Sequence, residues 1–352
     1  MNRDRVRGMY LGIAIGDALG MATEGLSVSQ IRECFPHGIR QYEPPSKEHK
    51  WFQGKNAGTW TDDTQLTLAT SRALVQAKGF DMDSIAEFHV EALRQSLEGV
   101  KSCGGSGVPG WGRTTANAIR NIANNVHWSR SGFTEDCNSG HGNGVVMKVA
   151  PLAAWLVSPF ARRGEDWVEF KFYQKMVSFS EMTHYTKKSA IAAIVHIHNL
   201  AACMMSDAKT YDPIVEFNEV FRSMYDFCQS EMFDIFHLYG EPEDIFGPLN
   251  LIEKNLTPEE IANRFGNGSC NIAHSLPFTY CYWLNYHDSV ELLYSLAEAG
   301  GDTDTNASIA GGMLGALRGT AIFPEHLVKN LFQSEMILRE ADRFCDTFGI
   351  VN

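Results

Sequence analysis

The chain has 352 residues, of which 42 are acidic and 30 basic, and it carries a formal charge of −12. Hydrophobic residues make up 44% of the sequence, which is enough for a packed core and excludes an intrinsically disordered chain. The net negative charge argues against general nucleic-acid binding, because that requires a basic surface, and a phosphate-bearing substrate would need a local positive feature such as a metal ion.

The first segment, residues 3–21, combines basic residues with an apolar run. A secretory signal peptide shares this pattern, but here Asp17 interrupts the apolar run and no clean cleavage site follows. We therefore expect a helix of the folded protein at 3–21 and a cytoplasmic location.

Signals for the ends of helices recur along the chain. The pattern S-x-x-E at 84–87 fits a capping box, with Gly99 as the expected end of that helix, and residues 257–260 repeat the box with proline at the first helical position. A long, alanine-rich helix is expected at 186–206. Further helices are expected at about 3–21, 64–78, 114–125, 147–157, 165–179, 213–230, 289–299, 305–318 and 334–347.

The span from 190 to 205 is apolar enough to raise the question of a membrane segment. It contains His196, His198 and Asn199, and it is shorter than the roughly 20 apolar residues that a spanning helix needs. We therefore expect a buried core helix there and no membrane partner.

Alternating apolar and polar runs with hairpin turns are scarce, so the sequence predicts an all-α fold. Length alone would allow about two domains. No linker or low-complexity stretch divides the chain, so we expect a single compact multi-helix domain over 1–352. Two long loops are expected, at 35–60 and 99–113, and each is interpreted either as a functional loop or as a mobile surface excursion.

The cysteines form no C-x-x-C pair, and their spacing matches no zinc framework. This usage predicts reduced, mostly buried thiols in a reducing compartment. The eight positions are Cys34, Cys103, Cys137, Cys203, Cys228, Cys270, Cys281 and Cys345.

Two acidic segments carry the chemistry: GTWTDDTQ at 58–65 and AGGDTDTNA at 299–307. In each segment, several residues with carboxylate or hydroxyl side chains follow one another where a loop is expected to lead into a helix. Adjacent carboxylates repel each other, and neither segment has a lysine or arginine nearby in sequence to compensate. Hard oxygen ligands of this kind suit Mg²⁺ or Mn²⁺. The alternative is that both segments are ordinary helix N-caps at the surface.

Glycine-rich segments add a second signal. Gly142, Asn143 and Gly144 precede an expected helix, where small residues let backbone N–H groups approach an anion. An ordinary turn has the same composition. The segment from Gly110 to Arg113 is equally open, since Arg113 could pair with a phosphate or with a local carboxylate.

Taken in order, four segments resemble the ADP-ribosylglycohydrolase family: GIAIGDALGMATEG at 12–25, GTWTDDTQLTLA at 58–69, GHGNGVVMKVAPL at 140–152 and AGGDTDTNASIAGGMLGA at 299–316. Weaker matches lie at 109–115 and 183–189. The resemblance covers about residues 8–320, and the two acidic motifs together are its most specific part. It implies an all-α fold and a binuclear Mg²⁺ or Mn²⁺ centre.

The resemblance also implies roles for individual residues. Glu24 stands where the family has a glutamate facing the scissile bond, Asp63 and Asp304 would act with it in catalysis, and Asp17 would order the first helix. His184 matches a family histidine near the ligand, although a core histidine is the alternative. The implied metal ligands are Thr61, Asp62, Asp63, Asp302, Asp304 and Thr305. The implied diphosphate-binding residues are Gly110, Gly112, Gly142, Asn143 and Gly144.

The chain departs from the family pattern at three places. Lys148 replaces an arginine, which keeps the charge and loses bidentate geometry. Gly140 and His141 replace a commoner small or aromatic pair at the rim of the diphosphate site. Asn306 replaces an apolar residue, and we expect that change to affect only packing.

The expected activity is hydrolysis of the bond between ADP-ribose and a modified protein side chain. Arginine is favoured because GTWTDDTQ resembles the arginine-directed relatives more than the serine-directed one. The expected partners are an ADP-ribosylated protein, ADP-ribose and a cognate ADP-ribosyltransferase, without nucleic acid or membrane. Two alternatives stay open: another two-metal enzyme such as a phosphohydrolase, and a non-catalytic or dual-role immunity protein of the same fold that blocks an ADP-ribosyltransferase.

Overall fold

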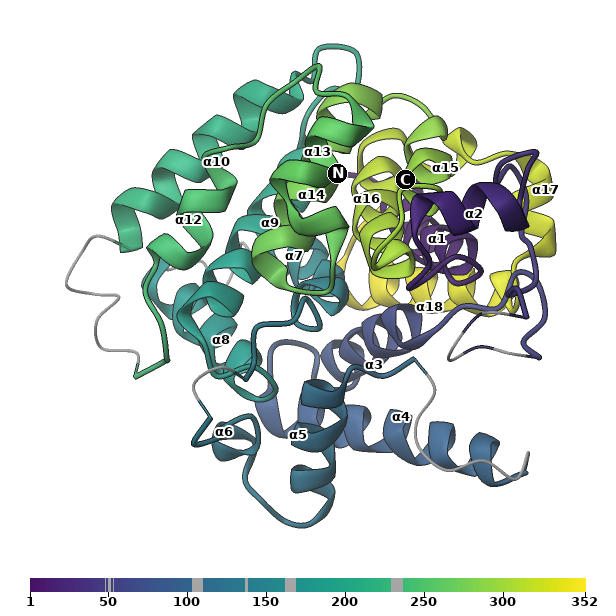
Figure 1. The fold of residues 1–352 in the computed structure, drawn as a ribbon. Coiled ribbons are helices and arrows are strands. Elements are labelled where there is room, and N and C mark those ends of the chain that lie inside the picture. Colours follow the sequence, from purple (N-terminus) through teal and green to yellow (C-terminus); the bar gives the residue numbers. More distant parts are fainter. Residues whose placement is uncertain are drawn as a thin grey trace.

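The fold is built from helices joined by loops. The computed structural model describes residues 1–47, 49, 52, 54–102, 110–136, 139–161, 169–228 and 237–352. Over these ranges the only strand-like pairings are two isolated bridges, Gly142 with Asn271 and Thr186 with Tyr239. The all-α fold predicted from the sequence is confirmed (Figure 1).

Two helices that lie far apart in the sequence, α1 (Arg3–Gly20) and α16 (Thr303–Arg318), pack directly against each other at the centre (Figure 1). Glycines recur along α1 at every fourth position, 8, 12, 16 and 20, so they share one helical face. A Cβ atom added at Gly12 would lie 2.0 Å from the carbonyl oxygen of Gly311 on α16. The two backbones therefore touch, and a larger residue at this crossing would separate the helices.

Helix α9 (Lys187–Met205) fills the core beside α16 and α7. Thr186 caps it by accepting a hydrogen bond from the backbone N–H of Ser189. Among the described helices, α9 alone is long and apolar enough to cross a membrane, and 78% of its apolar window is buried inside the protein. The expectation of a buried core helix is confirmed.

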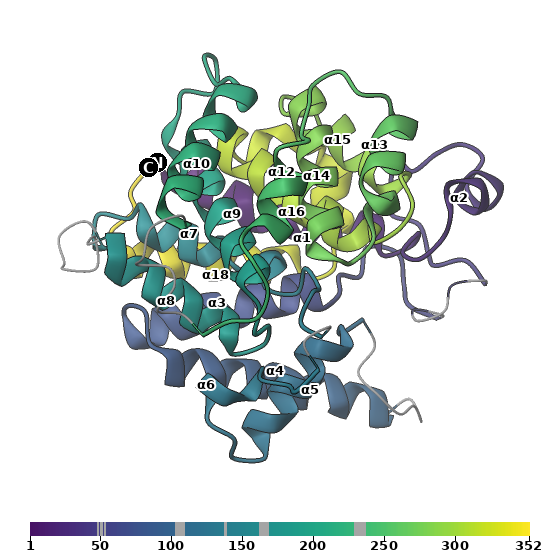
Figure 2. The same cartoon turned by 60° about the vertical axis from the view of Figure 1, so that its left-hand side comes forward.

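Helix α3 (Asp62–Ala77) pairs with α4 (Met82–Ser102), and α18 (Ser334–Phe348) packs on both α1 and α3. Figures 1 and 2 both place α4, α5 (Arg113–Ala123) and α6 (Trp128–Ser131) at the same end of the molecule. The two ends of the chain lie side by side, because the backbone N–H of Arg3 donates to the carbonyl of Val351 at 3.0 Å.

The remaining helices cover the core. They are α2 (Val28–Cys34), α7 (Ala150–Leu156), α8 (Glu169–Glu181), α10 (Pro213–Cys228), α12 (Glu243–Leu249), α13 (Pro258–Arg264), α14 (Ile272–Tyr286), α15 (Glu291–Ala297) and α17 (Glu325–Asn330), with 3₁₀ turns η1 (Val146–Lys148), η4 (Gly266–Gly268) and η5 (Thr320–Ile322).

The capping box predicted at 84–87 is wrong. Helix α4 begins two residues earlier, at Met82, and the Asp81 side chain accepts the backbone N–H of Ser84 at 2.8 Å. Asp81 therefore takes the place of the expected cap. The helix also continues through Gly99 to Ser102, so Gly99 does not end it. The second box is confirmed, since Thr257 and Glu260 exchange both capping hydrogen bonds at the start of α13.

Other differences from the sequence prediction concern element type. The expected helix at 147–157 is divided into the single turn η1 and helix α7, which starts at Ala150. Helices α2, α6, α12, α14 and α17 were not predicted. Of these, α14 is aromatic-rich with Pro277 inside it, and both features normally argue against a helix.

The structure confirms the part of the cysteine prediction that concerns unpaired, mostly buried thiols, for the cysteines it describes. The six described cysteines are unpaired, and four of them are buried, while Cys34 is half-buried and Cys270 is exposed. Cys103, Cys137, the start of the helix expected at 165–179 and residues 103–109 of the loop expected at 99–113 lie outside the described residues.

Candidate functional site

The first acidic motif lies where the chain enters α3. The side chain of Thr61, the residue before the helix, makes no capping hydrogen bond. Instead the Asp17 carboxylate on α1 accepts the backbone N–H groups of Thr61 at 2.9 Å and Thr64 at 3.0 Å, and the Thr64 hydroxyl at 2.6 Å. Asp17 thus orders the start of α3. Asp62 and Asp63 follow on the first turn, both buried.

The second acidic motif opens α16 and meets the first. Asp302 precedes the helix without making a capping bond, and its carboxylate accepts the Asn143 side-chain amide at 2.7 Å. The Asp304 carboxylate accepts the backbone N–H of Thr305 at 2.8 Å. The Thr305 hydroxyl donates to the Asp63 carboxylate at 3.2 Å. The two acidic motifs therefore form one cluster.

Glu24 joins this cluster from the loop after α1. Gly20, the last residue of α1, packs so tightly on α16 that an added Cβ would lie 2.3 Å from the carbonyl oxygen of Thr303. This close packing brings the following loop to the start of α16. Carboxylate oxygens of Glu24, Asp302 and Asp304 consequently lie within 4.8 Å of one another.

Burial of so many acids has an electrostatic cost that appears in their pKa values. Burial raises the pKa of Asp17 to about 6, against the opposing hydrogen bonds from Thr61 and Thr64. Burial, followed by repulsion from neighbouring carboxylates, also raises the pKa of Glu24, Asp62, Asp63 and Asp304, and burial raises that of Asp302. Ordinary surface N-caps would show neither burial nor mutual repulsion, so that alternative does not describe these residues.

The donor set of the cluster fits a hard divalent cation. Carboxylate and hydroxyl oxygens surround it, which is the chemistry that Mg²⁺, Mn²⁺ and Ca²⁺ prefer. Oε2 of Glu24 and Oδ1 of Asp63 are buried and have no hydrogen-bond partner. Buried carboxylate oxygens need a partner, and cations bound in the cluster would supply one to each.

One buried ammonium acts on this cluster. Lys148 has no solvent exposure, and its Nζ donates to the Thr183 hydroxyl at 3.2 Å. Burial lowers the pKa of Lys148 to about 7, while the negative charge of Asp62 opposes the shift. The positive charge that neither acidic motif has nearby in sequence is thus supplied by a residue on a different segment.

The Gly142–Gly144 segment packs against His184. A Cβ atom at Gly144 would lie 3.1 Å from Cε1 of His184, and one at Gly142 would lie 3.5 Å from Nε2. Burial lowers the pKa of His184 to about 3, and its Nδ1 lies 3.0 Å from the Thr183 hydroxyl, so the ring is neutral. The structure therefore brings this glycine segment and the predicted ligand histidine together.

The other residues predicted to bind the diphosphate differ in their surroundings. Gly110 has a left-handed φ of 85°, and an added Cβ would lie 3.1 Å from Oδ1 of Asp62, so it borders the cluster. Gly112 precedes α5 and faces open space. The side-chain amide of Asn143 is already bonded to Asp302 and Ser275, so the contact the structure shows for it is within the protein. Their contact with a diphosphate stays a prediction.

Comparison with known proteins connects this geometry to a family. The sequence matches the family model for ADP-ribosylglycohydrolase over residues 1–350. The chain belongs to the ADP-ribosylglycohydrolase family. Membership indicates a glycohydrolase enzyme.

Relatives and a solved structure resemble this ADP-ribosylglycohydrolase along nearly its whole length. An uncharacterized protein of Archaeoglobus fulgidus is 27% identical over 95% of this chain and 93% of its own. The ADP-ribosylarginine hydrolase Tri1 of Pseudomonas putida is 26% identical over 97% of this chain and 78% of its own. A solved ADP-ribosylglycohydrolase-related protein complex has a TM-score of 0.68 at 20% identity, covering 98% of each chain, which shows the shared fold.

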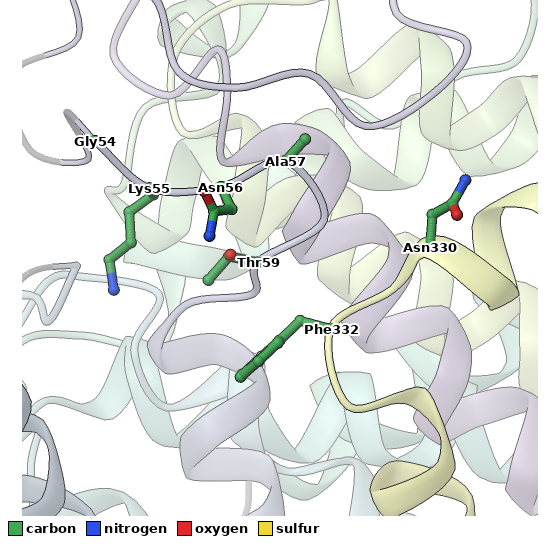
Figure 3. Close-up of a pocket in the computed structure, with 7 residues that line it drawn as sticks. All are labelled: Gly54, Lys55, Asn56, Ala57, Thr59, Asn330 and Phe332. Carbon is green, nitrogen blue, oxygen red and sulfur yellow. The ribbon is translucent and has the colours of Figure 1, made fainter.

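A surface pocket of about 390 Å³ borders the segment that leads to Thr61 (Figure 3). Phe332, half exposed, forms one wall, and the indole N–H of Trp60 donates to its carbonyl at 2.9 Å. The lining residues are Gly54, Lys55, Asn56, Ala57, Thr59, Asn330 and Phe332. None of the predicted site residues is among them.

Sequence reasoning missed two features that support the acidic cluster. The first is the turn Gly266–Gly268, whose three residues all have positive φ and whose last carbonyl accepts the backbone N–H of Asp302 at 3.1 Å. Its sequence, Gly-Asn-Gly, is the same as that of residues 142–144, and this repetition could have pointed to the turn. The second is Asn306, expected to affect only packing. That expectation is wrong, because its fully buried side chain makes hydrogen bonds to three residues.

Proposed function

We propose that this protein is a metal-dependent hydrolase that cleaves the bond between ADP-ribose and a modified arginine side chain of a protein, and that residues 1–352 form its single domain. The observation that carries the proposal is the convergence of two acidic motifs, joined by the Thr305–Asp63 hydrogen bond at 3.2 Å, in a chain of the ADP-ribosylglycohydrolase family. The arginine linkage is supported by the 26% identical relative named ADP-ribosylarginine hydrolase.

Charge balance supports a pair of ions. Five carboxylates belong to the cluster, and burial raises the pKa of each: those of Glu24, Asp62, Asp63, Asp302 and Asp304. Glu24 is the proposed proton donor and is neutral in that role. If the other four are ionised, one divalent ion leaves two negative charges uncompensated in a buried space, whereas two ions neutralise all four.

We propose two Mg²⁺ or Mn²⁺ ions held by the four aspartates of the cluster, Asp62, Asp63, Asp302 and Asp304, together with Thr61 and Thr305. When bound, such ions lower the pKa of a coordinated water and fix ribose hydroxyls.

We assign the acid and base roles in this reaction to different residues of the chain. The bond that breaks joins C1″ of the ribose to a guanidinium nitrogen, and the bond that forms joins C1″ to the oxygen of water. Asp63 and Asp304 orient this water and accept its proton. Glu24, whose pKa burial raises well above the usual value, donates a proton to the departing nitrogen. Separated roles of this kind follow the pattern of glycoside hydrolysis.

Binding of ADP-ribose is assigned to the glycine segments. Gly142, Asn143 and Gly144 lie against the neutral His184, and Gly110 borders Asp62. We propose that this surface receives the diphosphate, with the ADP-ribosylated protein as the substrate partner. The absence of disulfides among the six described cysteines supports a reducing compartment such as the cytoplasm.

A single assay tests the proposal. The protein is incubated with arginine-, serine- and aspartate-linked ADP-ribosyl substrates, with Mg²⁺, with Mn²⁺ and with EDTA. Release of free ADP-ribose from the arginine substrate, dependent on metal, is the expected result. Inorganic phosphate instead of ADP-ribose would indicate a phosphohydrolase. No turnover of any substrate, together with inhibition of an ADP-ribosyltransferase, would indicate a binding protein.

A further inference from the structure

A closed ring of buried hydrogen bonds runs from Asp302 through three side chains and back. The Asn143 amide donates to Asp302 at 2.7 Å and to the Ser275 hydroxyl at 3.0 Å. Ser275 donates to the Asn306 carbonyl oxygen at 2.6 Å, and the Asn306 amide donates to the backbone carbonyl of Gly268 at 2.8 Å. The backbone N–H of Asp302 donates to that same carbonyl at 3.1 Å.

The ring has a fixed direction. The Gly268 carbonyl can only accept, so it selects the amide end of Asn306 and turns the carbonyl end toward Ser275. Ser275 has one proton, which it gives to Asn306, so its lone pairs are left for the Asn143 amide. Asn143 must then present N–H groups, rather than its carbonyl, to Asp302. The orientation of Asn306 is in this way transmitted to the carboxylate of Asp302.

Burial makes this orientation difficult to change. Ser275 and Asn306 have no solvent exposure and Asn143 is 5% exposed, so water cannot replace a lost partner without a rearrangement. The ring joins α14, α16, the Gly266–Gly268 turn and the Gly142–Gly144 segment. Asn306 occupies a position where the family resemblance implies an apolar residue, which cannot take part in such a ring.

We infer that Ser275 and Asn306 are positioning residues that hold the Asp302 carboxylate, through Asn143, in the orientation that binds a divalent cation. This inference rests on the proposed metal site. The side-chain hydrogen bonds of Ser275 and Asn306 go to Asn143, Thr279, Gly268 and each other, and not to a carboxylate of the cluster. Their effect is to keep the Asn143 N–H on one oxygen of Asp302, so that the other oxygen faces the cluster.

The chain offers a matched pair of variants. Thr279, on the same helix as Ser275 and equally buried, also donates to the Asn306 carbonyl, at 3.2 Å. Ser275→Ala and Thr279→Val each remove one hydroxyl from the same acceptor. Of the two hydroxyls, only that of Ser275 also accepts a hydrogen bond from the Asn143 amide. A purely structural role would make the two variants behave alike.

The experiment measures Mn²⁺ affinity by calorimetry, without substrate, for the full chain, Ser275→Ala, Thr279→Val and Asp302→Asn, and thermal unfolding in EDTA for each. Ser275→Ala is expected to bind Mn²⁺ about tenfold more weakly, since part of a hydrogen bond to a charged group is lost. The Mn²⁺ affinity of Thr279→Val is expected to lie within about twofold of that of the unchanged protein. Its loss of thermal stability should be similar to that of Ser275→Ala. Hydrolysis by Ser275→Ala should recover at saturating Mn²⁺.

The outcomes separate the two proposals. Equal Mn²⁺ affinity of Ser275→Ala and Thr279→Val, with weak binding by Asp302→Asn, overturns the positioning role and leaves the metal site standing. Unchanged affinity in Asp302→Asn, or no Mn²⁺ binding by the unchanged protein, overturns the metal site and this inference with it. If Ser275→Ala fails to fold, Ser275→Cys keeps the shape with a weaker donor, and the same comparison with Thr279→Val decides.

Discussion

The hydroxyl of Thr305 donates to the carboxylate of Asp63 at 3.2 Å, across a sequence separation of 242 positions. Each residue lies on the first turn of its own helix, α16 or α3, so the contact sets two helix N-termini face to face. Helix N-termini carry partial positive charge, which favours the carboxylates gathered between them. The dipoles compensate only part of the buried negative charge, and a bound cation would compensate more.

The first prediction concerns Asp304. Asp304→Asn keeps the shape of the side chain and removes one negative charge from the cluster. We expect release of ADP-ribose to fall by roughly a hundredfold or more, because a displaced metal ligand costs several kcal/mol of transition-state stabilisation. Turnover measured at saturating substrate and metal checks this. Asp226→Asn, at an exposed position on α10, is the control and should keep full activity.

The second prediction concerns Asp17. Its carboxylate accepts two backbone N–H groups and the Thr64 hydroxyl at the start of α3. Asp17→Asn replaces one acceptor oxygen by an NH₂ group that faces donors. We expect the free energy of unfolding to fall by about 1–3 kcal/mol. Denaturant unfolding in EDTA measures the loss. An unchanged unfolding midpoint would mean that Asp17 does not order the start of α3.

The third prediction links pH and metal. The pKa of Asp17 is raised by burial from 3.8 to about 6, and its neighbours shift in the same direction. An acid with a raised folded-state pKa contributes stability that is present below its unfolded pKa and lost as the pH rises through the folded value.

For Asp17 this window is from about pH 4 to pH 6. A divalent ion binds the deprotonated acids, so the gain in Tm on adding Mg²⁺ should grow across this range. Paired melting curves in Mg²⁺ and EDTA check it. A gain independent of pH would contradict the coupling.

The fourth prediction concerns the α1–α16 crossing. Gly12→Ala places a Cβ atom 2.0 Å from the Gly311 carbonyl oxygen, a distance that only movement of the backbone can relieve. We expect a loss of stability of more than about 3 kcal/mol, or failure to fold. Gly247→Ala is the matched control. It lies inside helix α12, where the added atom meets nothing within 4 Å beyond its chain neighbours. Its stability should change by no more than about 1 kcal/mol, because the gain in helix propensity is opposed by crowding against the following Pro248.

The fifth prediction tests diphosphate binding without disturbing the fold. An added Cβ at Gly112 meets nothing within 4 Å, so Gly112→Ala should leave Tm unchanged. If Gly112 lies against the diphosphate, the methyl group should weaken ADP-ribose binding by about tenfold, because close approach of the backbone is lost. Calorimetric titration with ADP-ribose measures this. Equal affinity would remove Gly112 from the binding surface.

Local chemistry explains which sequence predictions were confirmed. The capping box at Thr257 and Glu260 involves residues three apart, and the structure contains it. The box expected at Ser84 failed because the backbone N–H of Ser84, which the Glu87 side chain should accept in such a box, donates to Asp81 instead. Competing caps of this kind cannot be ranked from one sequence, since their energies differ by less than about 1 kcal/mol.

Contacts over long separations were only partly predictable. The two acidic motifs could be identified, and the family resemblance implied that they meet, whereas the residues that orient Asp302 were invisible. Ser275 and Asn306 are 31 positions apart and lie on different helices. An asparagine among small apolar residues resembles a packing substitution until its partners are known. The glycines at every fourth position of α1 were a readable signal for a tight helix crossing that sequence reasoning did not use.

The pairing of α1 with α16 also constrains how the protein is made. Gly20 and Thr303, which touch at this crossing, are separated by 283 positions. Bringing such distant segments together closes a very long loop. The chain loses conformational entropy in closing this loop before the packing of the two helices can stabilise the fold. During synthesis, α1 therefore leaves the ribosome well before α16 is made. Until then its apolar surface has to be covered by other segments of the chain or by a chaperone. A prematurely terminated chain lacking α16 would have neither a closed core nor the second half of the acidic cluster.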